Sequence, residues 1–386
     1  MSEGSGRKRI PELDGLRVIM IGIVSWYHIW QQSWLAPMIG SYSLDWMLRS
    51  GYVWVDGTVL LSAFLLFLPY AQAGMEGTAL PDTRDFYKRR AIRIMPSYYF
   101  FLLLVFFAIC LPWNLYSSPQ YMVKDLATHF SFTFPFFRDT LLATPLGGAC
   151  WTLAIEVQAY ALFPLVARGV LKHPVITLGT MAAICFGFRA WCIWALVDYA
   201  GVVNQLINFL DVYVIGIVSA AVFLRIRKAN EKKAFPVWAQ AAFTVVFIAI
   251  FFGLTKLLRL QATSMGTEGI QKNQMLLRPA FALCFAGLVL SAPFALKPLR
   301  FLLGNRVMHF LAGISMNYYL IHQVFAVHLK RIQFPPSVSE TPNFAGEQPW
   351  QNQYTLAAFG FSLLAAILIT YGIEKPAARW LHRRKG

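Results

Sequence analysis

The amino-acid sequence predicts an all-α, polytopic membrane protein with about ten transmembrane helices and with both termini in the cytoplasm. The 386 residues are 57% hydrophobic and only 13% charged, and the mean hydropathy is +0.52. A single soluble core cannot bury that much apolar surface, so lipid must cover much of the chain. Apolar runs of about twenty residues, long enough to cross a bilayer as helices, recur from one end of the chain to the other.

These runs predict the order of the helices and a single membrane domain over residues 1–386, without an appended soluble domain. The run at 275–294 is the least regular, because Arg278 and Pro279 interrupt it. Residues 112–149 are rich in aromatic residues, Pro and Ser, and we expect them to lie along the outer surface as short amphipathic pieces. The ten expected helices cover residues 17–34, 52–73, 91–112, 150–168, 174–197, 203–224, 237–258, 275–294, 307–328 and 352–373.

The net charge of +16 has a topological explanation. With the amino terminus inside, ten helices place 24 of the 34 Lys and Arg residues in cytoplasmic segments, nine outside and one, Arg189, within a helix. This asymmetry is typical of multi-pass proteins of the plasma (inner) membrane, which are in contact with lipids. Because membrane topology explains the basic residues, we expect no nucleic-acid partner. The cytoplasmic groups are Arg7 to Arg9 with Arg17, then residues 84–93, Arg168 with Lys172, and residues 225–233, 297–306 and 375–385.

Cysteine and histidine spacing indicates neither a disulfide framework nor a metal site. The five cysteines are scattered in or beside apolar runs, and the histidines form no pattern such as HExxH. We therefore expect no metal and no bound cofactor.

Arg17 and His28 are the most informative pair in the chain. They lie eleven residues apart on the first expected helix. Eleven residues make about three helical turns, so both side chains share one face, with the imidazole roughly 16 Å deeper than the guanidinium. Burying an ionisable group at that depth costs several kcal/mol, so a residue of this kind inside the membrane is by default a candidate for a functional site. The pair therefore indicates a functional site inside the membrane.

Two further helices carry charged residues that lipid-facing helices do not need. Arg90 and Arg93, spaced i and i+3, project together from the cytoplasmic start of the third helix. Glu156 lies about one and a half turns inside the fourth helix, which begins near Trp151. A lone carboxylate among aliphatic residues needs a partner, and Gln158 cannot face the same side.

In the expected order, these stretches resemble the integral-membrane acyltransferase-3 family nearly from end to end. Members of that family move acyl groups onto cell-envelope sugars and other acceptors. The resemblance includes the LDGLR opening with its R-x10-H pair, the R-x-x-R pair, a W-[ST]-L-x-x-E element and an S-x-x-x-Y-L-x-H element. The residues that carry it are Asp14, Arg17, His28, Val55, Asp56, Leu61, Ser62, Phe64, Arg90, Arg93, Trp151, Glu156, Phe163, Pro164, Ser315, Tyr319, Leu320, His322, Glu374 and Pro376.

The resemblance implies a membrane-embedded acyltransferase. A hydroxyl is a weak nucleophile, so its attack on a thioester needs a positioned base, and we expect His28 to be that base with Glu156 orienting or stabilising its imidazole. The co-substrate is expected to be acyl-CoA, most simply acetyl-CoA, with an envelope glycan or a lipid-linked sugar as acceptor. Arginine forks suit the phosphates of the donor. The expected substrate-binding residues are Asp14, Arg17, Arg90, Arg93, Trp151, Tyr319 and His322.

Several of these residues also have structural interpretations. Arg17 could pair with Asp14, His322 could be a satisfied core histidine, and Arg90 and Arg93 could be topological anchors. For the whole chain, the alternative from another class is a transporter or flippase, since intramembrane charges also mark substrate pathways. The sequence shows no clear internal symmetry to favour it.

Two aspartates outside the expected site favour structural roles. Asp56 is expected to cap the outer end of the second helix. Asp211 in the sixth helix is expected to form a buried ion pair with Arg189 in the fifth.

Overall fold

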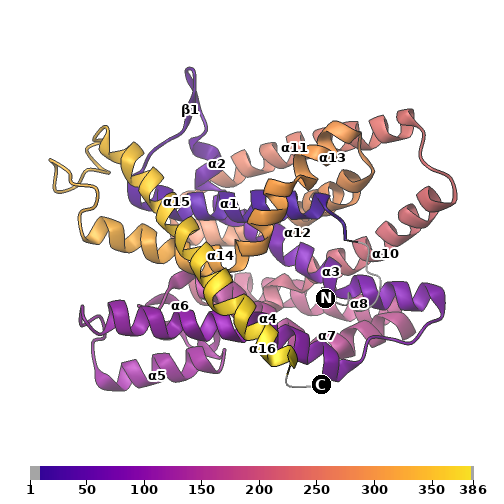
Figure 1. Cartoon of the computed structure of the whole chain (residues 1–386), viewed down its shortest axis with the longest axis horizontal. Helices are drawn as coiled ribbons and strands as arrows, with labels where there is room; N and C mark the ends of the chain where they lie inside the picture. The colour runs from indigo at the N-terminus through magenta and orange to yellow at the C-terminus, as the bar shows by residue number, and fades with distance from the viewer. Residues whose placement is uncertain (1–8, 384–386) are drawn as a thin grey trace.

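Ten helices of at least 20 residues form most of the part of the chain that the structure describes (Figure 1). The computed structural model describes residues 9–383, and within that part nine helical segments are long and apolar enough to cross a membrane. The tenth long helix, α1, is also long enough but carries more polar residues. The long helices are α1 (Glu12–Ser33), α3 (Trp54–Glu76), α4 (Thr83–Val105), α7 (Trp151–Lys172), α8 (Pro174–Trp194), α10 (Leu210–Lys232), α11 (Val237–Ala262), α12 (Gly266–Ser291), α14 (Arg306–Arg331) and α15 (Trp350–Ile369).

Short elements connect and extend these helices. The described strands are β1 (Met38–Ile39) and β2 (Tyr42–Ser43), an antiparallel hairpin that projects from the bundle in Figure 1. The fold class expected from the sequence, all-α and polytopic, is confirmed. Arg7, Lys8, Arg384 and Lys385, which belong to the expected cytoplasmic groups, lie outside the described residues. The short helices are α2 (Asp45–Arg49), α5 (Pro119–Phe130), α6 (Arg138–Leu142), α9 (Tyr199–Val202), α13 (Lys297–Gly304) and α16 (Lys375–Arg383).

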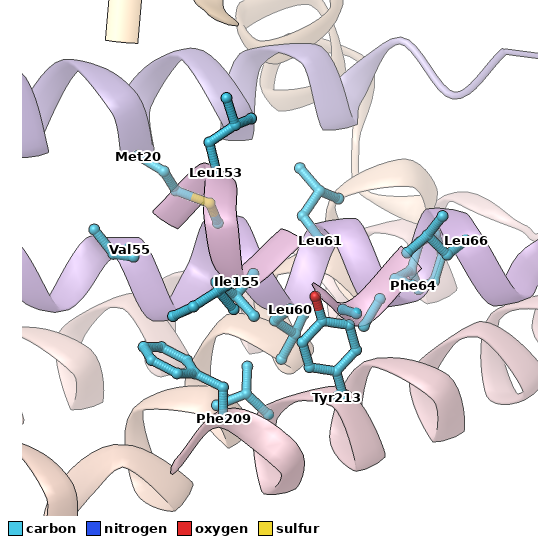
Figure 2. Close-up of a cluster of buried hydrophobic side chains, with 14 of the residues drawn as sticks. Met20, Val55, Leu60, Leu61, Phe64, Leu66, Leu153, Ile155, Phe209 and Tyr213 are labelled. Atoms are coloured by element: carbon cyan, nitrogen blue, oxygen red, sulfur yellow. The ribbon is translucent and has the colours of Figure 1, made fainter. Parts of the chain in front are cut away.

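The core lies where α1, α3, α7 and α10 meet. Figure 2 shows side chains from these four helices filling one space, among them Met20, Phe64, Ile155 and Tyr213, all of which are buried. Helices α3 and α10 approach closely at Gly216, where a Cβ atom would lie 2.7 Å from the Ala63 side chain. Glycine is therefore needed at that crossing, because any side chain would push the two helices apart.

The least regular apolar run is one continuous helix in the structure, with Pro279 inside α12. Arg278, which the charge count places among the nine outer Lys and Arg residues, is fully buried between the helices, and its Nε lies 3.2 Å from the carboxylate of Asp56. The expected capping role of Asp56 is therefore wrong, since α3 has no side-chain cap and Asp56 is a buried ion-pair partner.

A second buried ion pair lies beside the first. Arg189 donates to both carboxylate oxygens of Asp211 at 2.8 Å, which confirms the expected pairing of α8 with α10. Arg278 and Arg189 also donate to the same backbone carbonyl, that of Asn208, so the two pairs form one cluster. Two arginines and two aspartates balance in charge, and this balance lowers the cost of burying them.

The outer segment forms the short pieces that the sequence predicts, chiefly α5 and α6. Ser118 caps α5 by accepting from the Tyr121 amide. Lys124 on α5 bonds to Asp139 on α6 at 2.6 Å, and this hydrogen bond lowers the pKa of the Asp139 carboxyl. Arg138 likewise bonds to Asp198 before α9 at 2.5 Å and lowers its pKa. Exposed ion pairs thus tie the outer segment to itself and to the α8–α9 connection.

Candidate active site

A cavity of about 400 Å³ lies between α1, α3, α4, α7, α10 and α14. Its volume falls within the range of about 300–1,000 Å³ that is usual for ligand-binding sites. Its walls include arginines from segments that the sequence predicts to be cytoplasmic. Six of the nine site residues expected from the sequence line it: Asp14, Arg17, Arg90, Arg93, Glu156 and Tyr319.

Five arginines line the cavity, two of them not expected from the sequence: Arg9 and Arg227. Both belong to basic groups that the sequence explains as topological anchors. Which residue of such a group faces inward depends on how its helix is rotated against its neighbours. Periodicity in one sequence does not reveal that rotation for Arg227, which lies near the cytoplasmic end of α10.

Arg17 does not pair with Asp14. The Asp14 carboxylate instead forms an ion pair with the guanidinium group of Arg9 at 2.6 Å, and Nδ1 of His309 lies 3.5 Å from the same oxygen. Among the described residues, neither Arg17 nor Arg93 forms an ion pair, while Arg90 stacks on the rings of Phe86 and Tyr160 at 5.7 and 5.2 Å. These guanidinium groups are therefore available to an anionic ligand.

Glu156 faces the cavity from α7. It is half-buried, and the hydroxyl of Tyr160, one turn further along α7, donates to it at 2.9 Å. In the part of the chain that the structure describes, Glu156 is not a hydrogen-bond partner of His28. The carboxylate thus shares the arginine-lined cavity with a hydrogen-bonded tyrosine.

His28 lies towards the carboxyl-terminal end of α1, the end expected to face the outer side, and is half-buried. Its Nδ1 is 3.1 Å from Oε1 of Gln31, and the amide nitrogen of Gln31 donates to the Tyr27 hydroxyl at 2.8 Å. An amide oxygen can only accept, so the contact with Gln31 favours the tautomer with the proton on Nδ1 and a lone pair on Nε2; the amide nitrogen of Gln323 lies farther from Nδ1, at 3.5 Å. A neutral imidazole with a free Nε2 is the form that can take a proton.

His322 on α14 lies beside His28, with 5.3 Å between the ring centroids. Its Nδ1 donates to the Tyr319 carbonyl at 2.7 Å, and its buried Nε2 has no hydrogen-bond partner among the described residues. The Tyr319 ring, which lines the cavity, is also 5.3 Å from the His322 ring. Tyr319 therefore lies between the cavity and the two imidazoles, and neither His28 nor His322 lines the cavity itself.

Trp151 does not line the cavity. It begins α7, is half-buried, and packs against Phe209 with 6.0 Å between ring centroids. The expected role of Trp151 in substrate binding thus has no support from the cavity walls that the described residues form.

The fold and this arrangement define a class: a multi-pass membrane protein with an arginine-lined cavity, one wall of which is a tyrosine that packs against the nearer of two neighbouring imidazoles. A family profile described as an acyltransferase domain, that of acyltransferase family 3, matches residues 10–374, nearly the whole chain. The chain therefore belongs to the acyltransferase-3 family and is a membrane acyltransferase, as the sequence motifs indicate. No curated protein and no solved structure matched the chain.

Proposed function

We propose that the protein transfers an acyl group, most simply acetyl, from cytosolic acyl-CoA to a hydroxyl of an envelope glycan or lipid-linked sugar in the plasma (inner) membrane. The observation that carries the proposal is the face of α1 itself. Arg17 lines the cavity from that helix, and His28 lies eleven residues further towards the outer side. A donor held by its phosphates at Arg17 would extend along this face towards the imidazole.

The arginines support a donor with several phosphates. Charge-assisted bonds from guanidinium to phosphate are about twice as strong as neutral ones, and partial burial strengthens them further. Among the described residues, Arg17, Arg90 and Arg93 have no carboxylate oxygen within ion-pair distance, unlike Arg9. They would hold the nucleotide half of acyl-CoA, while its long, uncharged pantetheine arm would enter the cavity.

The free Nε2 of His28 supports its role as general base. The acceptor hydroxyl would give its proton to Nε2 while its oxygen attacks the thioester carbon. Collapse of the tetrahedral intermediate would break the carbon–sulfur bond, and the imidazolium would return the proton to the departing thiolate. The products are an ester and CoA thiol, and no metal or further reactant is needed.

His322 and Glu156 would assist from either side of the imidazole. The unpartnered Nε2 of His322 would accept a hydrogen bond from the acceptor and orient it, because an unsatisfied buried acceptor is costly unless a ligand provides the donor. The Glu156 carboxylate would favour the protonated imidazole through the field in the cavity rather than by direct contact.

The test uses purified protein in lipid nanodiscs with labelled acetyl-CoA, together with mass analysis of envelope glycans from cells with and without the protein. We expect thiol release that depends on added glycan, and loss of an ester mass from the glycans of cells lacking the protein. Transfer at wild-type rate by the His28→Ala variant would show that the base is assigned wrongly. If the wild-type protein did not bind acetyl-CoA, acetyl-CoA would not be its acyl donor.

A further inference from the structure

A second, smaller cavity of about 190 Å³ adjoins the first between α3 and α4. The two cavities share the side chains of Pro69, Arg90 and Arg93 as walls. Arg89 lines the side cavity but not the main one. The side cavity is below the usual volume of a whole ligand site, about 300–1,000 Å³, so it suits one part of a ligand whose remainder occupies the main cavity.

The walls of the side cavity are of two kinds. Leu66, Tyr70, Pro81 and Phe86 are apolar or aromatic. The other walls of the side cavity are cationic, because α4 supplies three guanidinium groups within five residues: Arg89, Arg90 and Arg93. A flat apolar ring joined to phosphates matches both kinds at once, and a nucleotide has that composition.

The arginines of this cavity have little competition from carboxylates. Arg89 approaches Asp85 only at 3.9 Å, and both side chains are more than half exposed, so this pair is weak. Arg90 is held by stacking on Phe86 and Tyr160 rather than by an acid, which leaves its N–H groups free to donate.

We propose that the side cavity binds the adenine nucleotide end of acyl-CoA, with Arg89 contacting a phosphate. The base lies against Phe86 and Pro81, the phosphates lie at the shared wall of Arg90 and Arg93, and the pantetheine arm continues into the main cavity. This inference rests on the proposed function, because it divides the same donor between two neighbouring cavities. An anionic lipid headgroup would offer the same phosphate chemistry, and the experiment separates the two.

The experiment measures Kd by calorimetry for acetyl-CoA, S-acetylpantetheine and adenosine 3′,5′-bisphosphate, using the full chain in zwitterionic nanodiscs. The test variant is Arg89→Ala. Its matched control is Arg84→Ala, since Arg84 is exposed on the same helix, lines neither cavity and carries the same charge. A second variant, Pro81→Trp, narrows the apolar part of the cavity from the connection before α4.

We expect Arg89→Ala to weaken acetyl-CoA and the bisphosphate about tenfold, the factor that corresponds to about 1.4 kcal/mol, with S-acetylpantetheine unchanged. Pro81→Trp should weaken the same two ligands, and Arg84→Ala should change none. Unchanged acetyl-CoA affinity in Arg89→Ala would overturn the inference and leave the proposed function intact. Equal affinity of the wild type for acetyl-CoA and S-acetylpantetheine would overturn the inference and also the proposed role of the cavity arginines in holding the nucleotide. If Arg89→Ala weakened the binding of anionic lipid but not the binding of the bisphosphate, the side cavity would be a binding site for a lipid headgroup, and the inference would be wrong. A wild type that binds neither thioester would instead refute the proposed function itself.

Discussion

The imidazoles of His28 and His322 lie side by side, 5.3 Å between ring centroids, although 294 residues separate them in the chain. Each has its Nδ1 engaged, His28 by the Gln31 side chain and His322 by the Tyr319 carbonyl. Both therefore present an unprotonated Nε2. Two imidazolium ions this close would repel each other strongly, so the pair carries at most one positive charge and can accept one additional proton.

The first prediction concerns this pair. His28→Ala should lower kcat by about 10²–10⁴, the usual contribution of a general base. His322→Asn should lower kcat less, and it should raise the KM for the acceptor while leaving the Kd of the donor unchanged, because its role is to orient the hydroxyl. Steady-state kinetics with varied acceptor would check this. The control is His173→Ala, an exposed histidine between α7 and α8, which should behave as wild type.

The second prediction concerns the cavity arginines. Arg93→Ala should weaken acetyl-CoA binding about tenfold or more, since it removes a charge-assisted donor worth about 1.5–3 kcal/mol. Calorimetry would measure the change, and Arg225→Ala is the matched control, because Arg225 is exposed and lines neither cavity. Identical affinities in the two variants would reduce Arg93 to a topological anchor.

The third prediction separates the charge of Glu156 from its hydrogen bond. Glu156→Gln keeps an oxygen that can accept from Tyr160 but removes the negative charge from the cavity. We expect kcat to fall without a loss of donor affinity, because the carboxylate favours the imidazolium and is not a phosphate ligand. Tyr160→Phe removes the hydrogen bond alone and serves as the comparison. Weaker donor binding in Glu156→Gln would show that the carboxylate instead positions the arginines.

The fourth prediction concerns the buried ion pair of Asp56 with Arg278. Arg278→Met should destabilise the protein by about 3–5 kcal/mol, because it leaves a carboxylate buried without a partner. The double variant with Asp56→Leu should recover much of that loss, since two apolar residues replace two charges. Thermal unfolding in detergent would compare the variants. A double variant less stable than Arg278→Met would contradict this explanation, and would point to the carbonyls of Val203 and Asn208 as the groups that need Arg278.

The fifth prediction is a pH dependence of the outer segment. Asp139 and Asp198 have a lower pKa in the folded protein than their ordinary value, owing to Lys124 and Arg138. Their ion pairs therefore add stability above the unfolded pKa of about 3.9, and this contribution is lost as the pH falls through the lower folded pKa. Both pairs are exposed, so each contributes at most about 1 kcal/mol.

The corresponding test is hydrogen exchange of residues 119–142. Arg138→Ala should be less protected than wild type at pH 7, and this difference in protection should shrink as the pH falls below about 3.9. A difference that does not shrink would mean that Arg138 acts by packing rather than by charge.

The sequence by itself determined the fold class, the order of the helices and the family. Hydrophobic runs and basic loops report how each segment is solvated, and that information is local to the segment. The R-x10-H and R-x-x-R pairs share one helix face each because helical geometry fixes their spacing, so Arg17, Arg90 and Arg93 could be grouped in advance. The pairing of Arg189 with Asp211 could also be expected, since a buried charge must find its opposite.

Only the tertiary structure decided which helix faces which. Asp56 forms an ion pair with Arg278 and does not cap a helix. Asp14 forms an ion pair with Arg9. The imidazole of His28 lies beside that of His322, and His28 forms no hydrogen bond with Glu156 among the described residues. The tertiary structure also turned Arg227 into the cavity and Trp151 onto Phe209. The physical reason is that the rotation of each helix about its axis follows from packing against all its neighbours at once, and within a mostly apolar sequence periodicity barely constrains it.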